Sequence, residues 1–313
     1  MKFNPKARVN TSSIRVRRGG GGGGRSGMGM PGGGRMGGMP GGFGAGGGIG
    51  GLIIFILILV VSSQCSGVGV PGIGGDDGSG GETETALDCS GQTELSQACK
   101  IAYTVDSLDA FWVDYLPRAA DTPYVEPGMV QFEGSTDSGC GQASSAMGPF
   151  YCPPDSKVYI DLTFFDEMLE GQLGAQGGDF AEAYVVAHEY GHHVQSLLGT
   201  LARAQSRETG PTSPSVRVEL QADCYAGLWT SAATTVTDES GEAFITEISD
   251  QDIALAIDAA TAVGDDRIQQ RSGGGINEEQ WTHGSAQERV RWFMVGYEQG
   301  SLQACDTFAA NAL

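Results

Sequence analysis

Apolar residues recur at helical spacing in five stretches of the chain. The first helix is expected to end at Pro117 and the second at Gly199, a residue type that is common just beyond a helix. Ser213 is a suitable cap for the third helix, and Ser285 with Glu288 three residues later forms a capping-box signature for the last one. The predicted helices cover residues 107–116, 180–198, 214–233, 249–257 and 285–297.

Alternating apolar and polar residues predict two short strands, over residues 130–133 and 158–162. Helices outnumber strands in residues 87–313, so the sequence predicts an α+β fold that is mostly helical with a small sheet. A stretch of this length can bury one sizeable core. We therefore expect a single domain over residues 87–313.

The chain before this domain has a different composition. Glycine makes up 21 of the 33 residues in Gly19–Gly51, which cannot form a packed core, and ten consecutive apolar residues follow at Leu52–Val61. We expect a basic, glycine- and methionine-rich disordered tail over residues 1–44 and a single transmembrane helix over residues 45–63. A polar linker is predicted over residues 64–86.

Charge is divided near the same boundary. The chain holds 18 basic and 38 acidic residues, a net charge of −20, but eight of the bases and none of the acids precede Asp76. The positive-inside rule then predicts a single-pass protein of the cell membrane, with its N-terminus in the cytoplasm and its domain outside. The acidic balance argues against a nucleic-acid partner, which requires a basic surface. A cleaved secretory signal is the alternative to a membrane anchor.

Six of the seven cysteines lie in the predicted domain, where an even number suits an oxidising compartment and disulfide bonds. Cys140 and Cys152 flank a turn and are the favoured pair. The remaining four leave several connectivities open, and the further candidate pairs are Cys224 with Cys305 and Cys89 with Cys99.

Two histidines four residues apart mark the helix predicted over residues 180–198. This spacing puts His188 and His192 on one face of the helix, where both rings can reach a single Zn²⁺. Glu189, next to the first histidine, is placed to act as a general base on a water molecule at the same metal. The motif therefore predicts a catalytic zinc site.

A third metal ligand is expected from the next helix. Glu219 and Asp223 lie four residues apart in a mostly apolar stretch, so they share a face. We assign Glu219 as the third ligand and Asp223 as the acceptor of the free ring N–H of a liganding histidine. Three protein ligands leave the fourth position open, as in catalytic zinc sites. The alternative is a solvated acidic helix face.

These motifs together resemble those of gluzincin metallopeptidases and, more closely, those of the bacterial neutral zinc metallopeptidase family. The resemblance rests on the basic tail, the single membrane segment and four motifs, Ser138–Pro153, His188–Gln195, Glu219–Gly227 and Thr282–Ser285. It implies a zincin-like fold and hydrolysis of peptide bonds. In similar zinc proteases a His or Arg near the position of His283 stabilises the oxyanion, so His283 is expected to be catalytic. A role in capping or packing the last helix is the alternative. Arg289 is a further candidate, but it could equally be a structural partner for an Asp or Glu.

The leading hypothesis is a membrane-anchored zinc endopeptidase that cleaves peptide or protein substrates outside the cytoplasm. An extended substrate is expected to pair with the strand at 158–162, which precedes the motif helix. The rival hypothesis is a non-hydrolytic envelope protein with a structural zinc site or a domain that binds a peptide or partner protein. Glu189 argues against it, because a structural site needs no base. The sequence sets no oligomeric state.

Overall fold

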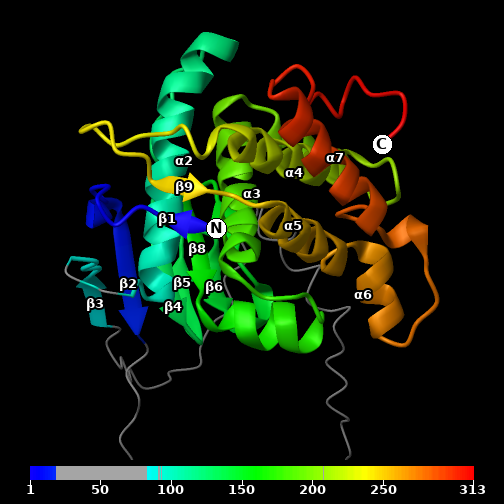
Figure 1. Cartoon of the computed structure of the whole chain (residues 1–313). Coiled ribbons are helices and arrows are strands. Elements are labelled where there is room, and N and C mark those ends of the chain that lie inside the picture. The colour runs from blue at the N-terminus through cyan, green and yellow to red at the C-terminus, as the bar shows by residue number, and fades with distance from the viewer. Residues whose placement is uncertain (19–82, 91, 93, 207) are drawn as a thin grey trace, which may run out of the picture.

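The structure, a computed structural model, describes residues 1–18, 83–90, 92, 94–206 and 208–313 (Figure 1). Its largest sheet has five strands, in the spatial order β3 (Thr83–Ala86), β2 (Ile14–Arg18), β4 (Gly128–Glu133), β8 (Lys157–Asp161) and β7 (Phe150–Cys152). The three inner strands run parallel, and β3 and β7 are antiparallel to their neighbours. Two smaller sheets pair β1 (Lys2–Phe3) with β9 (Ile245–Glu247) and β5 (Ser135–Ser138) with β6 (Gly141–Ser144).

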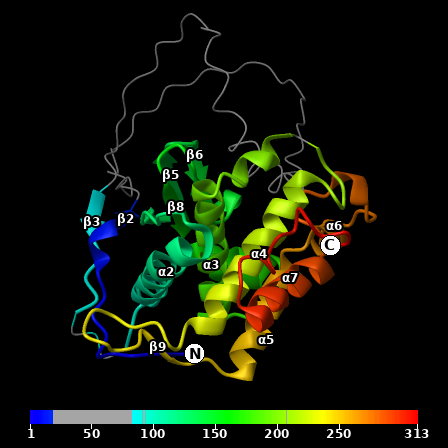
Figure 2. The same ribbon diagram turned by 90° about the horizontal axis from the view of Figure 1, so that it is seen from above.

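The α-helices of the described residues are α2 (Gln97–Ala120), α3 (Asp179–Leu197), α4 (Pro214–Ala232), α5 (Asp250–Ala262), α6 (Asp265–Arg271) and α7 (Ala286–Gln299). A π-helical segment, η4 (Phe164–Gln172), follows β8, and the short 3₁₀ helices are η1 (Thr11–Ser13), η3 (Ser145–Met147), η5 (Leu201–Ser206) and η6 (Glu278–Gln280). Helix α3 packs against both α2 and α4, and α7 packs on α4 (Figure 2). The prediction of a largely helical α+β fold with a small sheet is confirmed.

Both faces of the five-stranded sheet are covered. Met129 of β4 and Ile160 of β8 belong to the large core that the sheet shares with the helices. Their neighbours Val130 and Tyr159 belong to a smaller core on the other face, together with Ala143 of the β5–β6 hairpin. This alternation follows the two-residue period of strands that are buried on both sides. The sheet therefore supports the helices from one side only.

Local capping signals locate three helix starts correctly. The side chain of Ser213 accepts a hydrogen bond from a backbone N–H in the first turn of α4. Ser249 and Ser285 form capping boxes with the acidic residues three positions later, at the starts of α5 and α7. Helix α3 ends just before Gly199, whose φ of +74° is the left-handed conformation that favours glycine.

Helix α2 is longer than predicted at both ends. It begins at Gln97, capped by Ser96, and continues through Pro117 to Ala120. Because Pro117 has no N–H, the carbonyl of Val113 lacks its helical partner, but Val113 is 51% exposed and water can reach it. The prediction that Pro117 ends the helix is therefore wrong.

Strand β8 has no free edge, because it pairs with β4 on one side and with β7 on the other. The prediction that residues 158–162 form an edge for substrate is therefore wrong. Among the described residues, the edge strand of the sheet next to α3 is β7, which contacts that helix. Strand β7 has only three residues, too few to carry a recognisable alternation.

The N-terminal segment (residues 1–18) is part of the fold. Strand β1 pairs with β9, and β2 lies between β3 and β4 in the main sheet. The prediction of a disordered tail is wrong for these residues. Likewise, the end of the predicted linker forms β3.

The predicted transmembrane helix at 45–63 lies outside the described residues. Within the part of the chain that the structure describes, no helix is both long and apolar enough to cross a membrane.

Within the described part of the chain, three disulfide bonds join Cys140 to Cys152, Cys224 to Cys305 and Cys89 to Cys99. The favoured pair and both further candidate pairs are confirmed. Disulfides persist in oxidising compartments, so they indicate that the domain lies outside the cytoplasm.

Glu182, in the first turn of α3, gives a test of this packing. Its carboxylate accepts a hydrogen bond of 2.9 Å from the side chain of Gln97. Burial raises the pKa of Glu182 from 4.5 to about 7; Asp179 adds to this rise, whereas Gln97 and Lys100 oppose it. A carboxyl whose pKa is higher in the folded than in the unfolded state lowers the free energy of unfolding when it is ionised. This loss is complete above the folded-state pKa and absent below the unfolded-state pKa.

We therefore expect Glu182→Gln to raise the free energy of unfolding by roughly 1–3 kcal/mol at pH 8 and to change it little at pH 4. Urea denaturation at the two pH values measures this. An equal effect at both would show that charge burial is not the cause.

Candidate metal centre

Close helix packing brings the motif residues together. A Cβ at Gly191 in α3 would lie 3.0 Å from the backbone of Ala222 in α4, and one at Gly227 in α4 would lie 1.9 Å from the carbonyl oxygen of Phe293 in α7. Larger side chains at these positions would push the helices apart. The two glycines therefore let α3, α4 and α7 meet almost backbone to backbone.

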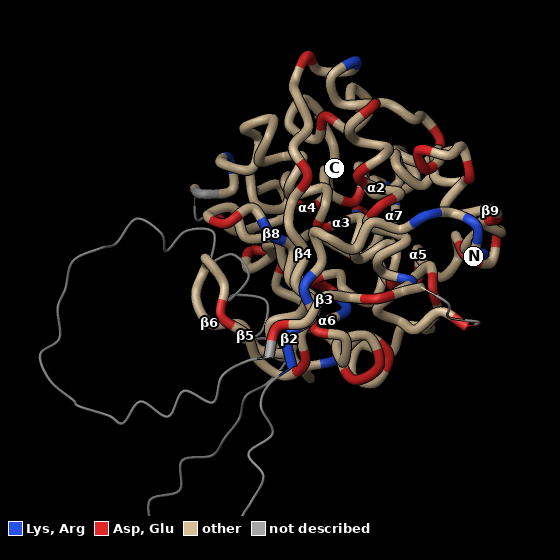
Figure 3. The backbone as a smooth tube through the Cα atoms, turned by 90° about the vertical axis from the view of Figure 1, so that its left-hand side faces the viewer, with Lys and Arg blue, Asp and Glu red and all other residues tan. Residues whose placement is uncertain are grey.

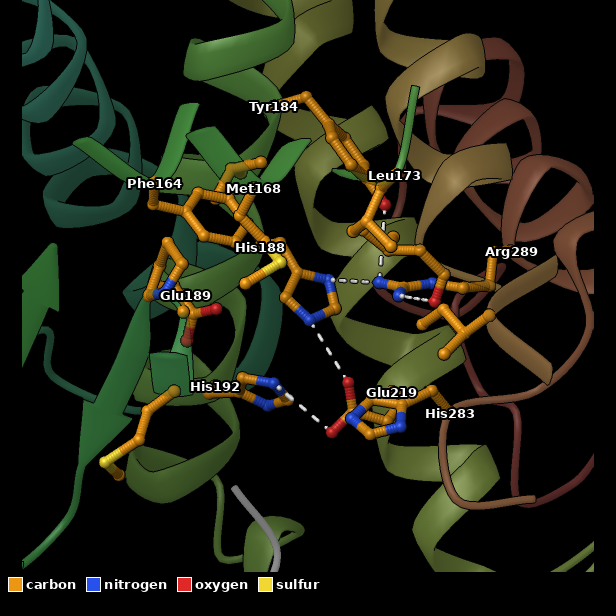
Figure 4. A pocket seen from close by; sticks show the side chains of 16 residues that line it. Phe164, Met168, Leu173, Tyr184, His188, Glu189, His192, Glu219, His283 and Arg289 are labelled. Atoms are coloured by element: carbon orange, nitrogen blue, oxygen red, sulfur yellow. Dashed lines mark hydrogen bonds and ion pairs between the residues drawn. The ribbon is translucent and has the colours of Figure 1, made fainter. Parts of the chain in front are cut away.

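The predicted ligands converge on one point. The Nε2 atom of His188 lies 3.2 Å from Oε2 of Glu219, and Nε2 of His192 lies 3.5 Å from Oε1 of the same carboxylate (Figure 4). One ligand atom from each residue lies within 4.8 Å of the others, and all three side chains are buried. The structure therefore joins the histidine pair of α3 to a carboxylate of α4 as a candidate metal site.

The other ring nitrogen of each histidine has a partner. Nδ1 of His188 lies 2.8 Å from Oδ1 of Asp223, the contact predicted for that carboxylate, and Nδ1 of His192 lies 2.9 Å from Oε1 of Gln195. The side-chain amide of Gln195 donates to the carbonyl of Val218, 2.7 Å away, which fixes its orientation. When each Nδ1 donates its proton, each Nε2 lone pair is free to bind a metal.

This donor set fits zinc. Two neutral imidazoles and one carboxylate are a common ligand set of catalytic zinc, and the partners on Nδ1 orient both rings. Within the described residues the cluster holds three such ligands. The six cysteines that could add a thiolate there are all in disulfides. The arrangement therefore matches a site that keeps one position for a water molecule or a substrate.

Asp223 is the centre of a buried charge network. Its carboxylate accepts two hydrogen bonds from the guanidinium of Arg289, 2.8 and 2.9 Å long, and one of 2.5 Å from the hydroxyl of Tyr184. Burial opposes ionisation of Asp223, but Arg289 and His188 outweigh it and lower the pKa of Asp223 to about 2. Arg289 is thus a partner of Asp223, the structural role that the sequence left open.

The charges at the centre depend on one another. Burial would raise the pKa of Glu219, but His192 and His283 hold it well below its usual range. Burial would lower the pKa of His188, but Asp223 and Glu219 raise it to about 10. The carboxylates of Glu219 and Asp223 therefore favour a positive charge at His188, which lies between them.

A cavity of about 120 Å³ opens beside these residues. Glu189 lines it together with the metal triad, and its carboxylate is drawn beside His188 in Figure 4. Burial raises the pKa of Glu189, whereas His192 and His188 oppose the rise. The rest of the wall is mostly apolar and includes Met147, Phe164, Met168, Leu173, Val185 and Ile268. Glu189 is therefore a buried carboxyl that faces the cavity.

The predicted catalytic residue His283 also lines the cavity. Its Nδ1 lies 2.8 Å from the hydroxyl of Thr282 and 3.5 Å from Oδ1 of Asp265. The other oxygen of Asp265 accepts the backbone N–H groups of three consecutive residues, from Thr282 to Gly284. Asp265, the first residue of α6, therefore holds both the loop and the ring of His283.

Comparison with known proteins agrees with the geometry. A family model described as "Putative neutral zinc metallopeptidase" matches residues 5–308. The chain belongs to this family. It is 53% identical to the uncharacterized protein Rv2575 of Mycobacterium tuberculosis over 216 residues, which are 69% of this chain and 72% of that protein. It is 44% identical to the uncharacterized protein YpfJ of Escherichia coli K12 over 194 residues, 60% of this chain and 63% of that one. No solved structure matches.

Several residues of this zinc metallopeptidase family member were not predicted to take part. Gln195 follows His192 by three positions, so its reach to that ring is visible in helical spacing. Asp265 and the apolar residues of η4 carry no such signal, because they come from elements that were not predicted. His193 bonds the hydroxyl of Tyr151 and the carbonyl of Val125 through its two ring nitrogens, so it links α3 to β7 and lies outside the ligand set.

Proposed function

We propose that this protein is a zinc-dependent endopeptidase that hydrolyses peptide bonds outside the cytoplasm. One observation carries the proposal: the Nε2 atoms of His188 and His192 lie close to the carboxylate of Glu219. These three residues line a cavity that Glu189 also lines. Family membership and the three disulfides support it. Attachment to the outer side of the cell membrane at residues 45–63 is part of the same proposal.

His188, His192 and Glu219 would hold the metal, and Asp223 and Gln195 would keep the two rings in place. Zinc supplies a Lewis acid that polarises the scissile carbonyl and lowers the pKa of a water molecule towards ~7. Glu189 accepts a proton from the attacking water as its oxygen bonds to the carbonyl carbon. When the C–N bond breaks, Glu189 passes this proton to the leaving nitrogen, which yields a carboxyl and an amine product.

Substrate binding is proposed at β7 and the apolar wall. Strand β7 is paired on one side only among the described residues, so an extended peptide can pair with its other side. Met147, Gly148 and Pro149 precede this strand and line the cavity. The apolar wall suits a large apolar side chain next to the scissile bond, because burial of that side chain stabilises the complex.

The rival function is a non-hydrolytic protein with a structural zinc site or a binding domain. A structural site is normally closed by four protein ligands, whereas three ligands and an adjoining cavity describe this centre within the described residues. The rival also gives Glu189 no task, although burial opposes the ionisation of its carboxyl. These points favour the peptidase.

A peptide library tests the function directly. The purified full chain is loaded with zinc and incubated with peptides of mixed sequence, and mass spectrometry identifies the products. We expect cuts next to large apolar residues, loss of cleavage with a chelator and its return with added zinc. Absence of any chelator-sensitive cleavage would favour the non-hydrolytic rival.

Replacement of His283 separates catalysis from packing. If His283 donates a hydrogen bond to the oxyanion, His283→Ala should lower kcat by ~10²–10³-fold and leave KM almost unchanged. Kinetics and melting temperature are measured on the same zinc-loaded preparation. A lower melting temperature with normal kcat would assign His283 to packing alone.

A further inference from the structure

The N-terminal segment is built into the domain at both of its ends. The β2 strand is in register with both neighbours, with Arg15 opposite Ala86 of β3 and opposite Val130 of β4. Near the start of the chain, the backbone N–H of Asn4 donates to the carbonyl of Phe244, 2.9 Å away. Thr11, between these contacts, donates its hydroxyl to the carbonyl of Leu87, 2.7 Å away.

The same segment contributes to the core. Ile14 is fully buried and Ala7 is 6% exposed, and both pack in the large core with residues of α2 such as Tyr103. The hydroxyl of Tyr103 donates to the carbonyl of Ala7. Without β2, a row of backbone groups on β4 would lose its partners and β3 would have no sheet to join. The segment is therefore an inner part of the fold and not an added edge.

Charge complementarity favours this docking. The N-terminal segment has six basic residues and no acid, whereas residues 83–313 have ten bases and 35 acids. Lys2 pairs with Glu247 of β9 at 2.6 Å, and Arg15 and Arg17 both pair with Glu84 of β3 at 3.3 and 3.2 Å. Figure 3 shows basic positions in blue along β2 and near the N-terminus, and acidic positions in red over the rest of the domain. Three of the eight bases that suggested a cytoplasmic N-terminus thus have acidic partners within the domain.

These contacts have a consequence for membrane topology. A hydrogen-bonded strand cannot be separated from its sheet by a hydrocarbon layer ~30 Å thick. The disulfides place the domain in an oxidising compartment. We infer that the N-terminal segment lies outside the cytoplasm together with residues 83–313, so that Arg18 and Thr83, which flank the intervening stretch, lie on the same side of the membrane. This inference is independent of the peptidase activity.

An engineered disulfide tests the inference in the full chain within cells. Cys65, the cysteine that forms none of the three disulfides, is first replaced by serine. The pair Arg15→Cys and Ala86→Cys faces across β2 and β3, so it should oxidise to a new disulfide that mass spectrometry detects beside the three native ones. In the control, Arg15→Cys is combined with Thr85→Cys, whose side chain points to the opposite face of the sheet, and little crosslink is expected.

Labelling in intact cells gives a second measurement that does not require a new disulfide. Ser12→Cys places an exposed thiol in the segment, and Ala202→Cys places one on the domain. A membrane-impermeant maleimide should label both to the same extent without permeabilisation. Two results would overturn the inference and restore a cytoplasmic N-terminus. One is the absence of a crosslink between Arg15→Cys and Ala86→Cys although the native disulfides are intact. The other is labelling of Ser12→Cys only after permeabilisation.

Discussion

Glu189→Gln should lower kcat by ~10²–10⁴-fold, the usual contribution of a general base, while zinc remains bound. Glutamine keeps the shape of the side chain but cannot accept the proton of the attacking water. Glu189 is buried at the cavity wall and is not one of the three clustered ligand residues, so the loss should fall on turnover and not on metal affinity. Steady-state kinetics and elemental analysis on one preparation measure both quantities.

Glu182→Gln is the matched control for this change. It makes the same replacement of a partly buried carboxyl on the same helix, but Glu182 bonds Gln97 of α2 and does not line the cavity. The control should therefore keep near-normal kcat. If zinc-loaded Glu189→Gln also kept its activity, the assigned proton transfer would be wrong.

Asp223→Ala should lower the free energy of unfolding by about 3–5 kcal/mol, because it leaves a buried guanidinium without its partner. Asp223 is fully buried and Arg289 is only 4% exposed, so water cannot replace the lost hydrogen bonds. The change also removes the acceptor at Nδ1 of His188, and zinc affinity should fall by ~10–100-fold. Denaturation of the metal-free protein and zinc titration measure the two effects separately.

Two further variants isolate the role of the ion pair. Glu298→Ala removes one exposed negative charge from α7 and should change stability by less than about 0.5 kcal/mol. Asp223→Ala combined with Arg289→Met removes both charges, and it should be less destabilised than Asp223→Ala alone. If the loss of unfolding free energy in the double variant equals the sum of the losses in the two single variants, Arg289 and Asp223 do not act as a pair.

The features that the sequence predicted well are local ones. Ser213, Ser249 and Ser285 cap helices through side chains only a few residues from the groups they bond, and four-residue spacing places His188 beside His192 regardless of the rest of the fold. Such features depend on a single turn of backbone, so neighbouring residues are enough to reveal them.

The features that escaped prediction depend on partners far along the chain. Strand β2 is stabilised by β3 and β4, which follow it by more than 60 residues, and its Arg-rich sequence resembles a solvated tail when considered alone. The contact between Gly191 and Ala222 sets the distance between α3 and α4, but the sequence of neither helix alone predicts this contact. The clustering of His188, His192 and Glu219 could therefore be predicted from sequence, whereas the cavity and the contacts that Asp265 makes with His283 could not.

The most direct test of the central claim is a zinc titration of the metal-free protein, with cleavage rate and bound metal measured at each step. The account predicts that the rate rises with added zinc and levels off at one zinc per chain, and that Glu219→Ala binds zinc more weakly and stays inactive over the same range. Full activity in the metal-free protein, or a chain with one zinc bound that cleaves no faster than Glu189→Gln, would contradict it.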